Sequence, residues 1–220
     1  MDKLLIFDLD GTLLDTIADL GGAVNHTLAL HGLPAHDLPS YKMMVGRGMR
    51  NLCKAALPEE RSRDDAFVDG FLKQFLDYYM EHIDSATLPY PGITALVDKL
   101  DSKGCKLAVA SNKLQIGTER LIRKFFPDIP FVAVCGNSPL YPLKPDAALV
   151  EHIMDAAEAS PEDTYMIGDS EIDIRTARNA GVNAIAVSWG FRPLQDLQEA
   201  DFIADTPEEI ENFLIRGNRA

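Results

Sequence analysis

An apolar run near the start of the chain, residues 4–7 (LLIF), leads directly into residues 8–12 (DLDGT). An apolar run of this length predicts a buried strand, and the glycine that follows predicts the turn at its exit. Two carboxylates, Asp8 and Asp10, therefore stand at the carboxyl end of the first strand, where open α/β sheets bind their ligands. Because the turn at Gly11 can bend both side chains towards one pocket, a nucleophile and a proton donor could act on one phosphate.

From residue 93 onwards, helical patterns alternate with short apolar runs. Helices are expected near residues 93–100, 116–126, 146–157 and 171–180, and strands at 106–110, 131–134, 164–168 and 184–188. Alternating strands and helices predict an α/β fold with a doubly wound, Rossmann-like parallel sheet. The last residues, 216–220, are expected to fray.

The second strand starts about 100 residues after the first, far beyond the ~30 residues of a simple crossover unit. The intervening chain has helical periodicity, with an aromatic stripe at residues 67–79, a shorter helix at 49–57 and one apolar face made by Ile17, Leu20, Val24 and Leu28. We therefore expect a helical cap domain at residues 15–90, inserted into a core domain of residues 1–14 and 91–220.

Charge and composition restrict the partners. The chain has 220 residues, of which 46% are hydrophobic, and a formal net charge of -13. Such a charge disfavours nucleic acids and anionic membrane surfaces, and an anionic substrate would need local cations or a metal. Three cysteines are too few for a disulfide framework, and neither a signal peptide nor a membrane span is recognisable, so a cytoplasmic location is expected.

Polar side chains at successive strand ends form a further pattern. They are Asp8 and Asp10, Ser111 and Asn112, Lys144, and Asp169 and Asp173. In a doubly wound sheet these ends face one crevice. A carboxylate can form an aspartyl-phosphate, paired carboxylates suit Mg²⁺, and a lysine and a hydroxyl can stabilise the transferring phosphoryl group. The pattern predicts a phosphoryl-transfer site in which Asp10 acts first as acid and then as base.

With these four motifs the chain resembles the haloacid dehalogenase superfamily, specifically its phosphatases with a helical cap after the first strand. The resemblance implies that Asp8 is the nucleophile, Asp10 the acid/base and Lys144 the third catalytic residue. It implies Mg²⁺ bound by the Asp8 carboxylate, the Asp10 backbone carbonyl and Asp169, with Asp173 supporting the site. The residues expected to bind the substrate are Thr12, Arg47, Ser111 and Asn112.

The segment 45–52 is similar to the Gly-x-Gly loop of phosphoglycolate phosphatases, and the sequence Ser-Asn-Lys at 111–113 is similar to their second motif. This resemblance makes 2-phosphoglycolate the leading substrate, with Arg47 as a cation for its carboxylate. The expected partner is a small phosphorylated metabolite, with no nucleic acid and no membrane, and the chain is expected to be a monomer or a homodimer.

Several alternatives stay open. A sugar-phosphate, nucleotide or pyrophosphate phosphatase would use the same core. A sugar phosphomutase resembles this chain as well, but carries a histidine in the first cap helix where this chain has Leu20. A receiver-type phospho-acceptor module also combines acidic residues, Mg²⁺, a hydroxyl and a lysine, but such modules are about half as long and place the acceptor on a later strand.

Overall fold

The fold is built on one parallel sheet, seen in a computed structural model that describes residues 2–216. The strands lie in the order β5-β4-β1-β6-β7-β8, and every neighbouring pair is parallel. Their bounds are Leu4–Phe7 (β1), Lys106–Leu114 (β4), Ala133–Asn137 (β5), Thr164–Gly168 (β6), Asn183–Val187 (β7) and Phe202–Ala204 (β8). The order reverses direction at β1, so the expected doubly wound α/β fold is confirmed.

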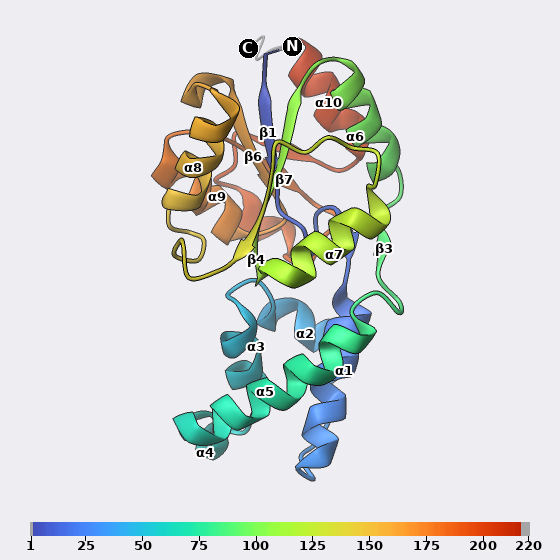
Figure 1. The fold of residues 1–220 in the computed structure, drawn as a ribbon, viewed down its shortest axis with the longest axis vertical. Coiled ribbons are helices and arrows are strands. Elements are labelled where there is room, and N and C mark those ends of the chain that lie inside the picture. Colours follow the sequence, from blue (N-terminus) through green and yellow to red (C-terminus); the bar gives the residue numbers. More distant parts are fainter. Residues whose placement is uncertain (1, 217–220) are drawn as a thin grey trace.

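Alternating side chains of β1 supply both faces of the sheet. Leu5 and Phe7 belong to the apolar cluster that includes α6, α7 and α10, whereas Leu4 and Ile6 belong to the cluster that includes α8 and α9. Figure 1 shows α8 and α9 on one side of the sheet and α6 and α10 on the other. These helices span Ile93–Ser102 (α6), Gln115–Phe125 (α7), Ala148–Ala157 (α8), Glu171–Ala180 (α9) and Pro207–Arg216 (α10). Full burial of each such apolar side chain contributes about 1.5–3 kcal/mol, which holds the three layers together.

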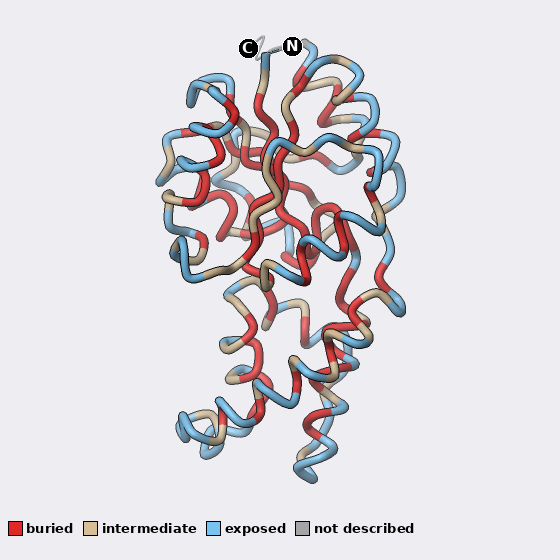
Figure 2. Tube along the Cα trace, viewed as in Figure 1, coloured by how far each residue is buried: buried red, intermediate tan, exposed pale blue. Residues whose placement is uncertain are grey.

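Five helices between the first two core strands form a separate lobe, here called the helical insert. They are Ile17–Leu30 (α1), Leu38–Met44 (α2), Met49–Ala56 (α3), Glu59–Ser62 (α4) and Asp65–His82 (α5). Figure 1 places the insert beyond the end of the sheet that carries α7. Phe71, Phe75 and Tyr79 of the aromatic stripe are buried in it, and Figure 2 shows the buried trace along the inner sides of α1 and α5. The expected stripe therefore forms the core of the insert.

The chain enters and leaves the insert through two adjacent segments. Strands β2 (Leu14–Asp15) and β3 (Leu88–Pro89) pair antiparallel, with Leu14 opposite Pro89. The Asp19 carboxylate of α1 accepts hydrogen bonds from the backbone nitrogens of Ala86 and Thr87 and, at 2.7 Å, from the Thr87 hydroxyl. The insert is thus joined to the sheet by a narrow connection with both chain segments fastened to each other.

Some elements differ from the sequence expectations. β4 continues through residues 111–114, three of which are polar, and β5 covers 133–137 rather than 131–134. β8 was not expected, because a three-residue strand leaves almost no periodic signal, and α10 was not expected either. Among residues 2–216, no helix is both long enough and apolar enough to span a membrane. The expected fraying concerns mainly residues 217–220, which lie outside the described part of the chain.

Candidate active site

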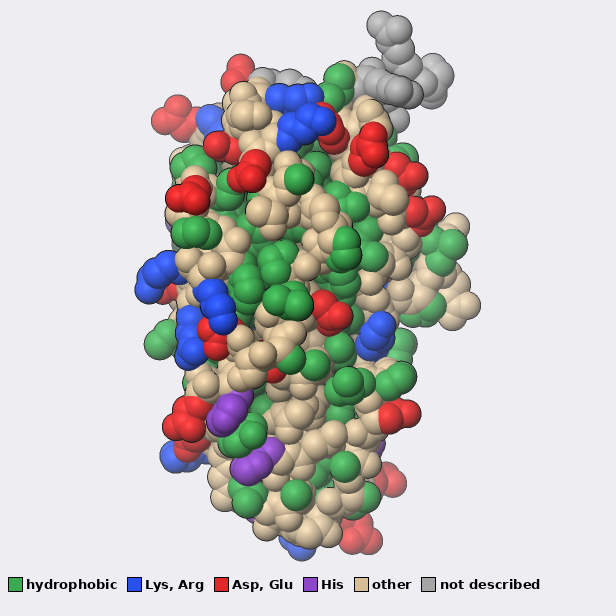
Figure 3. All heavy atoms as spheres, turned by 90° about the vertical axis from the view of Figure 1, so that its right-hand side faces the viewer, with side chains coloured by type: hydrophobic (Ala, Val, Ile, Leu, Met, Phe, Trp, Pro, Cys, Tyr) green, Lys and Arg blue, Asp and Glu red, His purple; other side chains and the backbone are tan. Residues whose placement is uncertain are grey.

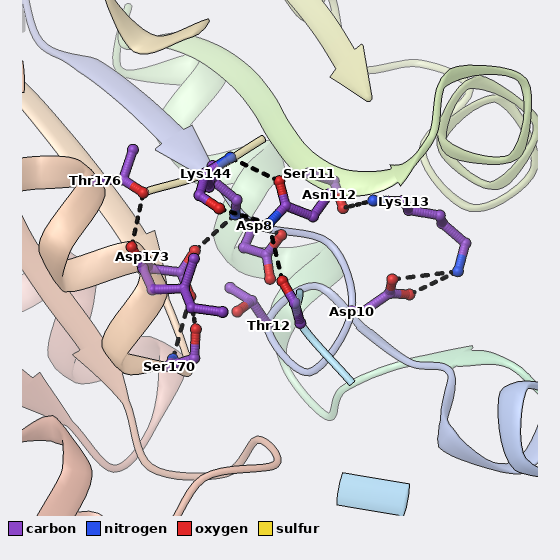
Figure 4. Close-up of polar contacts among 12 residues, drawn as sticks. Asp8, Asp10, Thr12, Ser111, Asn112, Lys113, Lys144, Ser170, Asp173 and Thr176 are labelled. Carbon is purple, nitrogen blue, oxygen red and sulfur yellow. Dashed lines mark hydrogen bonds and ion pairs between the residues drawn. The ribbon is translucent and has the colours of Figure 1, made fainter. Parts of the chain in front are cut away.

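The polar strand ends converge at the carboxyl edge of the sheet, next to the insert. Asp8 follows β1, Ser111 and Asn112 lie in the last part of β4, Lys144 lies in the loop after β5, and Asp169 follows β6. All five are buried, as is Asp173 in the first turn of α9. Figure 4 shows the side chains of Asp8, Lys144 and Asp173 directed towards one another. The structure therefore brings together residues that the four sequence motifs place far apart.

Lys144 joins two of the carboxylates. Its Nζ donates to Asp8 Oδ1 at 2.9 Å and to Asp173 Oδ1 at 2.6 Å. Burial alone would lower the pKa of Lys144, but Asp173 and Asp8 outweigh it and raise this pKa above its usual value. Lys144 is therefore a permanent cation at the centre of the site.

At Asp8, unlike at Lys144, the effect of burial on the pKa outweighs that of the neighbouring opposite charge. Burial raises the pKa of Asp8 to about 7, the Lys144 ammonium opposes this change, and Asp173 and Asp10 add to it. Because Lys144 is shared with Asp173, it does not offset the whole cost of an ionised Asp8. The site therefore gains from any further positive charge beside Asp8.

Three carboxylates are spaced for a metal ion. Oxygen atoms of Asp8, Asp169 and Asp173 all lie within 4.8 Å of one another. Burial raises the pKa of Asp169 well above its usual value, and the neighbouring Asp173 and Asp8 raise it further. The backbone fits closely around Asp169, since a Cβ at Gly190 or Gly11 would lie 2.3 or 2.4 Å from its side chain. An all-oxygen set of buried, mutually repelling carboxylates fits a hard divalent cation.

Asp173 has its own fixed environment. Its Oδ2 accepts hydrogen bonds from the Ser170 hydroxyl at 2.6 Å and the Ser170 backbone nitrogen at 3.2 Å, which forms a capping box at the start of α9. Because its Oδ1 is held by Lys144, both oxygens of Asp173 have partners. Asp173 therefore fixes the position of the Lys144 ammonium beside the carboxylate cluster.

Asp10 faces away from this cluster, towards the insert. Figure 4 shows its carboxylate directed at the Lys113 ammonium. Lys113 Nζ donates to both carboxylate oxygens, at 2.9 and 3.2 Å, and the Thr16 hydroxyl donates to Oδ1 at 2.7 Å. Lys113 was not among the expected site residues. Its position directly after the Ser-Asn pair at a strand end was the available signal.

The other residues expected to bind the substrate, Asn112, Ser111 and Thr12, form hydrogen bonds within the protein itself. Asn112 Oδ1 accepts from the Lys144 nitrogen at 2.8 Å, and its Nδ2 donates to the carbonyls of Lys144 at 3.0 Å and Gly46 at 2.9 Å. Ser111 Oγ accepts from the Lys113 nitrogen at 3.2 Å. Thr12 Oγ1 lies 3.5 Å from Asp169 Oδ1, at the limit of a hydrogen bond. Asn112 thus holds the Lys144 loop and the loop between α2 and α3 together.

The loop between α2 and α3 covers the site. Gly46, Gly48 and Met49 line a cavity of about 30 Å³ together with Leu20 and the carboxylates below. Arg192, from the loop after β7, donates to the carbonyls of Lys42 and, at 2.6 Å, of Val45. Backbone groups of this loop are therefore bound directly to the core.

Arg47 does not lie in the cavity. Its side chain is 67% exposed and pairs with Glu171 at 3.2 Å on the outer surface, whereas the Arg192 side chain is 4% exposed and lines the cavity. In this arrangement Arg47 points away from the cavity, because a glycine on either side lets the loop turn its arginine outward. Its contact with the substrate stays a prediction. Arg192, which sequence reasoning missed, is the arginine at the cavity; it follows no strand-end motif.

A buried nucleophile candidate, a lysine and a carboxylate cluster at the edge of a parallel sheet are the groups that a phosphoryl-transfer protein needs. Comparison with known proteins specifies the family. Residues 5–187 match the family model of haloacid dehalogenase-like hydrolases, and the chain belongs to this family. The expected family and its enzymatic class, a phosphoric monoester hydrolase, are confirmed.

Individual relatives match over most or all of the chain. The chain is 35% identical to a phosphoglycolate phosphatase of Agrobacterium fabrum, over 100% of this chain and 97% of that protein. It is 36% identical to a phosphoglycolate phosphatase of Caulobacter vibrioides, over 85% of this chain and 79% of the relative. A crystal structure from Lactobacillus delbrueckii subsp. bulgaricus, of a protein proposed to be a phosphoglycolate phosphatase, superposes with a TM-score of 0.88 at 34% identity. That match covers 97% of this chain and 99% of the other.

Proposed function

We propose that this chain hydrolyses 2-phosphoglycolate, or a similarly small phosphate monoester, in a Mg²⁺-dependent reaction through a phosphorylated Asp8. The observation that carries the proposal is the position of Asp8, which shares Lys144 with Asp173 and lies beside Asp169. The substrate is supported by relatives, matched over most or all of the chain, that are phosphoglycolate phosphatases. The finer parts of the proposal concern the metal, the intermediate and the roles of single residues.

The metal would be held by Asp8 and Asp169, together with the Asp10 backbone carbonyl. When bound, Mg²⁺ supplies positive charge for the phosphoryl oxygens and keeps the Asp8 carboxylate ionised at neutral pH. Without it, Asp8 with a pKa of about 7 would be protonated about half of the time at that pH. The chain's net charge of -13 makes such local compensation necessary for an anionic substrate.

The side chains of the site have different roles in the proposed reaction. The Asp8 carboxylate attacks phosphorus, while Lys144 and the Ser111 hydroxyl stabilise charge on the transferring group. Asp10 donates a proton to the departing oxygen. It then accepts one from the water that hydrolyses the aspartyl-phosphate. This role is supported by the direction of the Asp10 carboxylate, which faces Lys113 and the insert rather than the carboxylate cluster.

We further propose that residues 15–90 act as a cap that moves. A cavity of about 30 Å³ holds roughly one or two waters, which is too small for a phosphorylated metabolite. Substrate binding therefore requires the loop around Gly46 to withdraw from Asn112 and Arg192. Renewed closure would exclude bulk water from the acyl-phosphate. Leu20 lines the cavity where a mutase would need its histidine, which favours hydrolysis over transfer to a sugar.

The direct test measures phosphate release from 2-phosphoglycolate and a panel of sugar phosphates and nucleotides, with Mg²⁺ and with EDTA. Asp8→Asn serves as the blank. Enzyme quenched during turnover and reduced with borohydride should carry homoserine in place of Asp8, detected by mass spectrometry of the peptide. Release that is independent of Mg²⁺, or undiminished in Asp8→Asn, would refute the proposed chemistry. A preference for another ester would retain the chemistry and refute the substrate.

A further inference from the structure

We propose that Lys113 is a positioning residue that orients the Asp10 carboxylate towards the leaving group, and that Tyr79 of the helical insert holds Lys113 in place. The inference rests on the proposed role of Asp10 as acid and base. It concerns two residues to which that mechanism assigns no role.

All three hydrogens of the Lys113 ammonium have acceptors. Two go to Asp10 Oδ1 and Oδ2, at 2.9 and 3.2 Å, and one goes to Tyr79 Oη at 2.5 Å. The Lys113 side chain is 0% exposed, so water does not compete for these bonds. The ammonium is therefore held at a single position between the sheet and α5.

Asp10 is held asymmetrically. Its Oδ1 accepts from both Lys113 and Thr16, whereas among the described residues its Oδ2 accepts only the longer bond from Lys113. The carboxylate plane is thus fixed, and Oδ2 is the oxygen with hydrogen-bonding capacity left for a leaving group. Thr16 alone, with one bond to one oxygen, would let the carboxylate rotate.

Tyr79 brings the insert into this arrangement. It is 1% exposed, stacks on Phe75 with 5.4 Å between ring centroids, and presents its hydroxyl to the core residue Lys113. The contact therefore joins α5 of the insert to β4 of the sheet. Through this contact, the orientation of the Asp10 carboxylate depends on a side chain of the insert.

Fold stability does not explain a lysine at this position. A buried ion pair is often no more stabilising than well-packed apolar side chains of the same volume. Replacing Asp10 and Lys113 together would suit these surroundings, because the buried Ile83 and the Lys113 side chain both lie within 4 Å of the Cβ position of Gly117. A charged pair retained here is accounted for by its effect on the orientation of Asp10.

The test compares phosphate esters that differ in whether their leaving group must be protonated to depart. Phenyl phosphate and 4-nitrophenyl phosphate have similar sizes, but 4-nitrophenolate departs readily without protonation, whereas phenolate and the alkoxide of 2-phosphoglycolate do not. The ratio kcat/KM reports the steps up to cleavage of the ester bond. In Lys113→Met, we expect kcat/KM to fall about 10²-fold for phenyl phosphate and 2-phosphoglycolate, and less than about tenfold for 4-nitrophenyl phosphate.

Tyr79→Phe tests whether Tyr79 holds Lys113 in place, and it changes the packing little. We expect a loss of about three- to tenfold with the same order of substrates, because the ammonium loses one of its three acceptors. Tyr78→Phe is the matched control. Tyr78 is the neighbouring tyrosine of α5, whose ring stacks between His26 and His82, and its replacement should leave all three kcat/KM values within about twofold.

Each outcome has one meaning. A loss concentrated on the poor leaving groups supports the inference. Equal losses on both aryl esters, or no loss, overturn it while the unmodified enzyme still shows the proposed activity. If Lys113→Met does not fold, as judged by circular dichroism, the leaving-group dependence of Tyr79→Phe decides alone. If the unmodified enzyme releases no phosphate in an Asp8-dependent manner, the proposed function fails and the inference falls with it.

Discussion

Lys144 Nζ lies 2.9 Å from Asp8 Oδ1 and 2.6 Å from Asp173 Oδ1, so that one ammonium joins the end of β1 to the start of α9. Its side chain is 2% exposed. The two carboxylates that it joins, together with Asp169, form the group of acidic oxygens that fits a divalent cation. The lysine therefore has a structural part in assembling the site besides its proposed part in catalysis.

Removal of this cation should affect both stability and catalysis. Lys144→Met leaves buried carboxylates without their partner, and we expect the metal-free protein to lose about 3–5 kcal/mol of unfolding free energy. The ratio kcat/KM should fall by at least about 10²-fold. Urea denaturation at pH 7.5 measures the first effect. Lys99→Met removes a half-exposed partner of Glu211 and should cost less than about 1 kcal/mol. Similar costs for both variants would contradict the central position of Lys144.

The pKa of Asp8 predicts an unusual dependence of stability on pH. Because burial raises this pKa from 3.8 to about 7, the folded protein binds the proton more tightly than the unfolded chain does. The contribution of Asp8 is therefore most favourable below pH 3.8 and is lost as the pH rises through about 7. In EDTA, Asp8→Asn should flatten this decline. At pH 8 the variant should be more stable than the parent by up to about 4 kcal/mol, at about 1.4 kcal/mol per pH unit.

Urea denaturation of both proteins at intervals from pH 4 to pH 8 checks this expectation. Parallel profiles would show that Asp8 does not titrate in this range. Turnover should be abolished in the same variant, which would combine higher stability with lost activity at one residue.

Magnesium should stabilise the folded protein through the carboxylate cluster. At a concentration 100 times the dissociation constant, Mg²⁺ should add about 2.7 kcal/mol to the unfolding free energy. Asp169→Asn should remove most of this increment, because it takes a charged oxygen from the group formed with Asp8 and Asp173. Thermal denaturation with Mg²⁺ or EDTA provides the measurement. In the control Asp201→Asn, at a surface pair with Arg178, the increment should persist.

The two arginines near the α2–α3 loop should behave differently. Arg192→Gln removes buried bonds to the carbonyls of Lys42 and Val45 and so weakens closure of the loop over bound substrate. We therefore expect KM to rise about tenfold or more. Amide hydrogen exchange in residues 42–48 should also accelerate. Arg47→Ala removes only an exposed pair with Glu171 and should change kcat/KM less than about threefold. A larger effect at Arg47 would restore it as a substrate contact, made in a conformation other than this one.

Local pattern was sufficient for much of the architecture. The apolar run before Asp8 and the alternation after residue 93 predicted the parallel sheet, because buried strands and amphipathic helices have distinct periods. The same reasoning placed Asp8, Ser111 and Asp169 together, since parallel strands bring their carboxyl ends to one edge. Strand β8 was missed because a very short strand has too few residues for a period to emerge, and helix α10 was missed as well.

The sequence by itself thus determined the sheet, the helical insert and the set of polar groups at the strand ends. Tertiary structure alone decided how those groups pair. Lys113 and Asp10 are 103 positions apart, and Arg192 reaches a carbonyl 147 positions away. No local periodicity encodes such contacts. The first depends on the pairing of β1 with β4, and the second on where the insert rests against the core. The direction of Arg47 depends likewise on positive backbone φ angles at Gly46 and Gly48, which any number of loop sequences with two glycines could adopt or avoid.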